Sequence, residues 1–115
     1  YNRLNSGKEL IMLQTQIIGN LVMEPELKHV GEREEKTVCT LTVASNRPGR
    51  DKPSILRVEV WGKSAENCAK FLNKGSGIFA CGDLDIDIYE KDDEKRVAVK
   101  LVNAKVEFTD RIVNK

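Results

Sequence analysis

The stretch that most constrains the fold is Leu56–Gly75, because its apolar spacing changes there from the period of a strand to that of a helix. In its first part, Leu56, Val58 and Val60 share one face of a strand, so the residues between them point the other way. The outward residues include Trp61, the only tryptophan of the chain. We therefore expect an exposed indole ring on a strand that leads directly into a short helix.

The second part of this stretch predicts the helix and its ends. Small and apolar residues recur at three- and four-residue spacing, namely Ala65, Cys68, Ala69 and Leu72. This spacing is typical of a helix that buries one stripe against a core. Ser64 is the expected cap, because its hydroxyl can accept a bond from a free backbone N–H. Gly75 is expected to stop the helix in the left-handed conformation.

Four further segments are predicted as strands, at 12–23, 37–45, 76–89 and 96–108. Gly19 predicts a bulge or bend in the first, and a change of apolar phase near Val102–Asn103 predicts a bulge in the last. The residues expected to face the interior of the last two strands are Leu84, Ile86, Ile88, Val97, Val99 and Leu101. The order of elements predicts an all-β, five-stranded OB-fold barrel with one short α-helix between strands 3 and 4.

The length of 115 residues allows one domain with a single core. We assign residues 12–109 to the barrel, residues 110–115 to a polar C-terminal end, and residues 1–11 to an N-terminal extension or a segment foreign to the natural protein. The three cysteines, Cys39, Cys68 and Cys81, are far apart in sequence and predict free, buried side chains in a reducing compartment. No stretch is apolar over a membrane-spanning length, which favours the cytoplasm.

The residue pattern does not predict an enzyme, a metal site or a cofactor. The only histidine, His29, is expected in a polar link without a nucleophile nearby in sequence. Asp83, Asp85 and Asp87 project from one strand face, but alternate residues are about 7 Å apart, which is too far for one ion to bridge all three. Glycine-rich phosphate loops are also missing from the sequence.

Binding of a flat, anionic ligand is the better interpretation. Trp61 lies between Arg57 and Lys63 in sequence, and a ring flanked by cations can stack an unpaired base while the cations hold phosphates. A Pro/Gly-containing loop before this strand carries three further cations, Arg47, Arg50 and Lys52. Because the net charge is only +1, the positive potential must be local.

Several motifs resemble those of the bacterial single-stranded DNA-binding protein family. Residues 61–76 (WGKSAENCAKFLNKGS) are similar to its signature of an aromatic, Gly-Lys, an Ala-Glu that opens a helix, and a closing Lys-Gly-Ser. The motifs GNL at 19–21 and EPEL at 24–27, then GDL at 82–84 with Tyr89, follow in the family's order. The closing segment 102–108 is similar too, so the resemblance covers roughly residues 12–109.

This resemblance implies an OB-fold that assembles into dimers or tetramers and wraps single-stranded DNA over aromatics and cations. Trp61 and Tyr89 stand where the family has stacking aromatics, and Arg57, Lys63 and Lys74 stand where it has cations that neutralise the DNA backbone. Replication or recombination proteins are the implied further partners.

The chain departs from the family pattern at several positions. Arg47, Pro48 and Ile55 stand where members commonly have aromatics, and Asp85 and Asp87 stand where they often have arginines. The family's acidic tail does not follow residue 115, which suggests either a part of a longer chain or a specialised relative from a mobile element. These departures leave two alternatives open: an OB module that acts chiefly through protein–protein contacts, and an RNA-binding domain.

Overall fold

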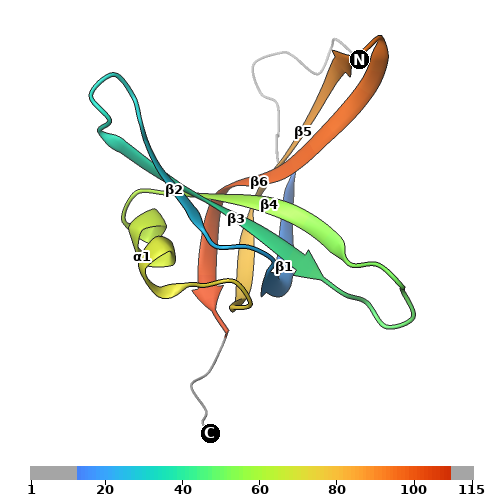
Figure 1. The fold of residues 1–115 in the computed structure, drawn as a ribbon, viewed down its shortest axis with the longest axis horizontal. Helices are drawn as coiled ribbons and strands as arrows, with labels where there is room; N and C mark the ends of the chain where they lie inside the picture. The colour runs from blue at the N-terminus through green and yellow to red at the C-terminus, as the bar shows by residue number, and fades with distance from the viewer. Residues whose placement is uncertain (1–12, 110–115) are drawn as a thin grey trace, which may run out of the picture.

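The computed structural model describes residues 13–109 (Figure 1), so the predictions for residues 1–11 and 110–115 lie outside the described part of the chain. Its elements, in order, are β1 (Gln14–Leu21), β2 (Glu26–Val30), β3 (Lys36–Ser45), β4 (Ser54–Trp61), α1 (Lys63–Phe71), β5 (Gly77–Lys91) and β6 (Glu94–Phe108). Within residues 13–109, no helix is long and apolar enough to cross a membrane.

Five of these strands close into a ring. The hydrogen-bonded order is β1-β5-β6-β4-β3, and β3 pairs back with β1, while β2 pairs with residues 36–40 of β3 on the same edge as β1. The helix α1 follows β4 and precedes β5. The predicted five-stranded OB-fold arrangement is therefore confirmed, with β2 as an additional strand.

The six strands form two three-stranded antiparallel layers, β1–β5–β6 and β2–β3–β4. Two short pairings, which we call the seams, join the layers. One seam pairs Asn20 and Leu21 of β1 with β3. The other is parallel and pairs Arg57 and Val58 of β4 with Lys100 and Leu101 of β6.

The core lies inside the ring and follows the predicted alternation. Its fully buried members include Cys39, Leu41 and Val43 of β3, Val58 and Val60 of β4, Ile78 and Ala80 of β5, and Leu101 of β6. On α1 and just after it, Ala65, Cys68 and Leu72 are buried, which confirms the predicted stripe.

The buried cysteines behave as small apolar side chains. The pKa of each buried thiol is raised to about 11, by burial for Cys39 and by burial together with the nearby Cys39 for Cys68. All three cysteines are free, and Cys81 is partly exposed. The prediction of free cysteines is confirmed, whereas the predicted burial is correct for Cys39 and Cys68 and wrong for Cys81.

The link predicted around His29 is wrong, because residues 26–30 form the strand β2. This strand is mostly exposed and carries three charged or titratable side chains in five residues. Its conformation is supported by backbone pairing with β3, which overrides the weak strand preference of Glu and Lys. Tertiary pairing of this kind is not visible in the local sequence.

The predicted ends of the helix are also corrected. The N-cap is Gly62, with a φ of 71° and no side-chain cap, so Ser64 lies inside the first turn. The helix ends at Phe71, and Leu72 is already extended. Gly75 has the expected positive φ of 97°, but it belongs to the turn that leads into β5.

The bulge predicted near Val102–Asn103 is confirmed, whereas at Gly19, where a bulge or bend was predicted, the strand pairing contains no bulge. The β5–β6 register shifts between Cys81 and Asp83, and Asn103 on the partner strand has a φ of 52°. The β1–β5 register runs through Gly19 without a shift. A side chain there would clash with the backbone carbonyl of Ala44, so glycine allows β1 to approach β3 at the seam.

The β5–β6 hairpin extends beyond the ring as residues 85–99, which we call the arm (Figure 1). Its turn consists of Asp92 and Asp93, both with positive φ. Four residues predicted to face the interior are exposed here, by 43 to 67 %: Ile86, Ile88, Val97 and Val99. The prediction failed because these strands are longer than the ring that they help to close, so their ends have no opposing layer.

Candidate nucleic-acid interface

The outer face of β4 carries Arg57, Glu59 and Trp61, in alternation with the buried Val58 and Val60. The indole of Trp61 is 41 % exposed. The predicted outward orientation is therefore confirmed, and its cause is the burial of the alternate valines inside the ring. A ring in this position is open to a planar ligand.

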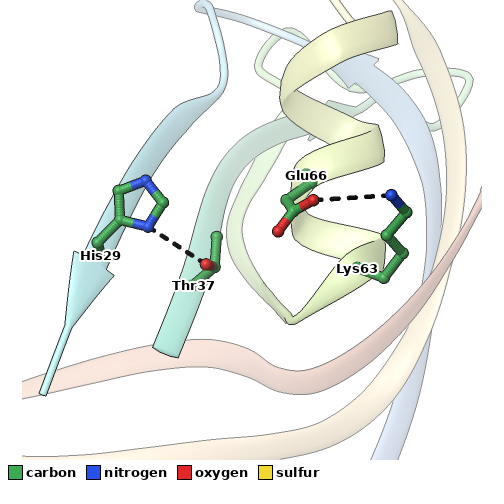
Figure 2. A network of polar contacts seen from close by, with 4 residues as sticks. All are labelled: His29, Thr37, Lys63 and Glu66. Atoms are coloured by element: carbon green, nitrogen blue, oxygen red, sulfur yellow. Dashed lines mark hydrogen bonds and ion pairs between the residues drawn. The ribbon is translucent and has the colours of Figure 1, made fainter. Parts of the chain in front are cut away.

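Trp61 borders a shallow depression between β3, α1 and the β2–β3 loop. Its lining consists of Glu35, Lys36, Thr37, Trp61, Gly62, Lys63 and Glu66. Figure 2 shows one side of this region, where Lys63 Nζ lies 3.8 Å from Glu66 Oε1 on α1. Both side chains are largely exposed, so this ion pair is weak and leaves Lys63 able to exchange Glu66 for a phosphate.

One further cation, Lys28 of β2, lies in the same cross-strand row as Trp61. Trp61 is paired with Val38 on β3, and Val38 is paired with Lys28 on β2. Next to this row, His29 Nδ1 lies 3.3 Å from Thr37 Oγ1 (Figure 2). Lys28 was not among the predicted contacts, because the strand β2 is not apparent from the local sequence.

Glu59 lies between Arg57 and Trp61 and could repel a phosphate there. Its Oε2 accepts a hydrogen bond of 3.1 Å from Lys100 Nζ on β6, across the parallel seam. This pair is partly buried, which reduces screening by solvent and neutralises the carboxylate locally. Lys100 was also missed, although it alternates with the buried Leu101 and thus belonged to the polar face of a predicted strand.

Tyr89 lies on the arm, and its side chain is 42 % exposed. Its cross-strand neighbour is Arg96, and Asp85 and Asp87 share its face. Asp85 is paired with Lys100, so part of the acidic row has a cation opposite to it. Within the described residues, no three His, Cys, Asp or Glu side chains gather as a metal site would require.

Trp61 and Tyr89 share one continuous outer face but lie at opposite ends of it. Trp61 is four residues beyond Arg57 on β4, while Tyr89 is paired with Arg96, four residues before Lys100. Because Arg57 and Lys100 are paired in parallel strands, the two rings are eight residues apart, or about 26 Å at about 3.3 Å per residue. They can only contact bases that are several nucleotides apart.

The remaining predicted cations fall into two groups. Arg47, Arg50 and Lys52 are exposed in the β3–β4 loop, which lies toward the Tyr89 end of the face. Arg50 of this loop donates to Oγ of Ser54, the first residue of β4, over 3.4 Å. Lys74 follows α1 at the end farther from Trp61, and its backbone N–H donates to Glu24. Of the predicted cations, Lys63 lines the depression beside the indole and Arg57 lies four residues away on the same face of β4, whereas Lys74 lies outside the sheet face.

Comparisons with known proteins agree with this geometry. The model of the single-strand binding protein family matches residues 12–109. Single-stranded DNA-binding protein 2 of Clostridium acetobutylicum is 31% identical over 102 residues, which cover 84% of this chain and 76% of that protein. Single-stranded DNA-binding protein 3 of Listeria innocua is 36% identical over 104 residues, which cover 85% of this chain and 64% of that protein. A single-stranded DNA-binding protein of Paenarthrobacter aurescens is 34% identical, over 83% of this chain and 67% of its own length.

Proposed function

The chain belongs to the single-strand binding protein family, and on that basis we propose that it binds and protects single-stranded DNA without regard to base sequence. The observation that carries this proposal is the half-exposed indole of Trp61 on the outer face of β4. Such binding serves DNA replication, recombination or repair. We propose that the barrel of residues 12–109 is the binding domain, that it acts by binding without catalysis, and that it acts in the cytoplasm.

In the proposed mechanism, unpaired bases stack on Trp61 and Tyr89 while cations hold the phosphates between and beside them. Arg57 and Lys63 serve the Trp61 end, and Lys74 serves a strand that continues past α1. The loop cations Arg47, Arg50 and Lys52 serve the Tyr89 end. Stacking contributes about 1–3 kcal/mol per base by alanine substitution, so these contacts suffice for micromolar or tighter binding.

The test is a titration of Trp61→Ala with a fluorescently labelled oligo-dT, read by anisotropy. Loss of one stacked base should weaken binding at least about tenfold, because about 1.4 kcal/mol corresponds to a factor of ten. Trp61→Phe is the matched control, since it keeps a ring on the same face. Unchanged affinity of a folded Trp61→Ala variant would remove the indole from the mechanism.

The unmodified protein offers a second readout. Oligo-dT should strongly quench the emission of Trp61, and log affinity should fall with log salt by about 0.7 per neutralised phosphate. Weak quenching would instead favour an OB module that acts through protein contacts. For that alternative, the exposed aliphatic face of the arm is the specific supporting observation.

We also propose that the protein forms homo-oligomers through β1. On its edge away from β5, β1 pairs with a described strand only at Asn20 and Leu21, so the segment 14–19 presents unpaired backbone groups. A second β1 could pair there about a two-fold axis. Light scattering distinguishes a dimer from a tetramer, and a monomer at all concentrations would contradict the proposal.

A further inference from the structure

A second pair of exposed aromatic rings lies where α1 meets the end of β6. Phe71 is the last residue of α1, and Phe108 is the last residue of β6. Their ring centroids are 6.5 Å apart, and the ring planes are inclined at 55°. The side chains are 58 % and 44 % exposed, so neither ring is used to fill the core.

These rings border a groove between the helix and the strand. The residues that line it are Ser64, Asn67, Cys68, Phe71, Val106 and Phe108. Phenylalanine side chains usually contribute their area to a core or an interface. Two that remain exposed side by side, with hydroxyl and amide groups at the rim, mark a surface that a ligand can cover.

Cations follow the exposed side of α1 toward this groove. Lys70 Nζ lies 5.2 Å from the centroid of the Phe71 ring. Lys63 is seven residues earlier on nearly the same helix face, about 10 Å away along the axis, and its side chain is 83 % exposed. The only carboxylate of α1 is Glu66, which already faces Lys63. Phe71 thus combines an exposed ring with a cation, and Trp61 shares a depression with Lys63.

The groove is also connected to the indole by one short element. Trp61 ends β4, α1 begins two residues later, and Phe71 ends α1. Nine helical residues span about 14 Å. A strand of nucleic acid that leaves Trp61 thus meets Lys63, then Lys70, and then the two phenylalanine rings.

We propose that the groove between Phe71 and Phe108 is a second base-stacking site, reached by single-stranded DNA that crosses α1 from Trp61. The inference rests on the proposed function and adds the path that the DNA takes, from Trp61 across α1 to the groove. Lys63 and Lys70 could bind any polyanion. However, they lie between the Trp61 ring and the Phe71–Phe108 pair, and this arrangement favours single-stranded DNA, which has bases along its whole length, over an acidic peptide. A short oligonucleotide held at Trp61 does not reach the groove, whereas a longer one does.

The test compares oligo-dT of two nucleotides, too short to extend from Trp61 across the about 14 Å of α1, with oligo-dT of about 16 nucleotides, the upper limit of the site size of one OB-fold. Trp61 emission reports binding, because the variants leave the only tryptophan in place. For Phe71→Leu and Phe108→Leu, we expect affinity for the longer oligonucleotide to fall about tenfold each. Affinity for the shorter one should not change. Leucine keeps an apolar side chain at the site, so folding is preserved while the aromatic face is lost.

Two further variants complete the test. Phe71→Tyr keeps a ring and should retain the affinity for the longer oligonucleotide. Lys70→Gln should reduce the salt slope for the longer oligonucleotide by about 0.7, the amount for one phosphate on a single strand, and leave that for the shorter one unchanged.

The outcomes separate the two proposals. If neither oligonucleotide quenches Trp61, both the proposed function and the second site fail. If quenching is normal but both leucine variants bind the longer oligonucleotide as the unmodified protein does, only the second site is overturned. Equal losses for both lengths would also overturn it, because the rings would then act through Trp61 and not on the continuing strand.

Discussion

The ring and the arm are built from the same two strands and the same alternating pattern, yet they bury their apolar residues very differently. Leu101 in the ring is fully buried, whereas Val97, four residues earlier on the same face of β6, is 60 % exposed. Both residues have an apolar cross-strand neighbour on β5, Leu84 and Ile88 respectively. Alternation thus determines which way a side chain points, and only an opposing layer determines whether it is buried.

The largest expected effect is on stability and contrasts Leu101→Ala with Val97→Ala. Removal of the Leu101 side chain leaves a cavity inside the ring and should lower the free energy of unfolding by about 3 kcal/mol. Val97→Ala removes side-chain atoms that already contact water, so its effect should stay below about 0.5 kcal/mol. Urea unfolding followed by Trp61 emission measures both.

One result would contradict this expected difference in stability between the two variants. If Val97→Ala destabilises the protein nearly as much as Leu101→Ala, the apolar face of the arm is covered in solution. A dependence of that effect on protein concentration would then identify another copy of the chain as the covering partner.

The next effect is a pH dependence that arises in the core, where Cys39 of β3 and Cys68 of α1 are buried. Burial disfavours the thiolate and raises the pKa of each thiol from 9.0 to about 11. Because the folded-state pKa is the higher one, the stabilisation is complete below about pH 9 and is lost as pH rises through about 11. Two pKa units correspond to about 2.7 kcal/mol for each thiol at most.

Unfolding midpoints in urea between pH 8 and 11 would measure this loss. Cys68→Ala should reduce the slope over this range, since one of the two buried thiols is gone. Cys81→Ala serves as the matched control, because that side chain is partly exposed. An identical slope in all three proteins would show that other groups cause the loss.

The smallest expected effect concerns DNA and compares Tyr89 on the arm with Trp61 on the ring. Tyr89→Ala should weaken binding of a long oligo-dT about fivefold, or about 1 kcal/mol, the lower end of the range for stacking. The loss should be smaller than for Trp61→Ala, because Asp85 and Asp87 share the face of Tyr89 and repel phosphates. Tyr89→Phe should bind normally, and a loss as large as that of Trp61→Ala would show that the two ends contribute equally.

Much of the fold could be predicted from local sequence, because burial inside a small ring imposes a regular spacing. The alternation around Val58 and Val60 predicted the strand, its inner face and the outward indole. The helix stripe of Ala65, Cys68 and Leu72 was predicted for the same reason. In each case a single element carries the whole signal.

The features that were missed depend on two or more elements. The strand β2 exists because β3 offers it an edge, and its own residues have little preference for a strand. The neutralisation of Glu59 by Lys100 requires the register of two parallel strands that are far apart in sequence. The proximity of Phe71 and Phe108 likewise depends on where the fold places the end of α1 relative to the end of β6. Spacing along one segment contains no information about such pairs.

The two seams have a consequence for what a bound ligand does to the protein. Each seam joins the layers through only two residues of β1 or β4, so separation of the layers breaks few backbone bonds and leaves both antiparallel ladders intact. Trp61 belongs to one layer and Tyr89 to the other. A polymer that binds both rings would bridge the two layers across the parallel seam. It would then raise the temperature at which the layers separate, and the rise would be larger for tighter binding.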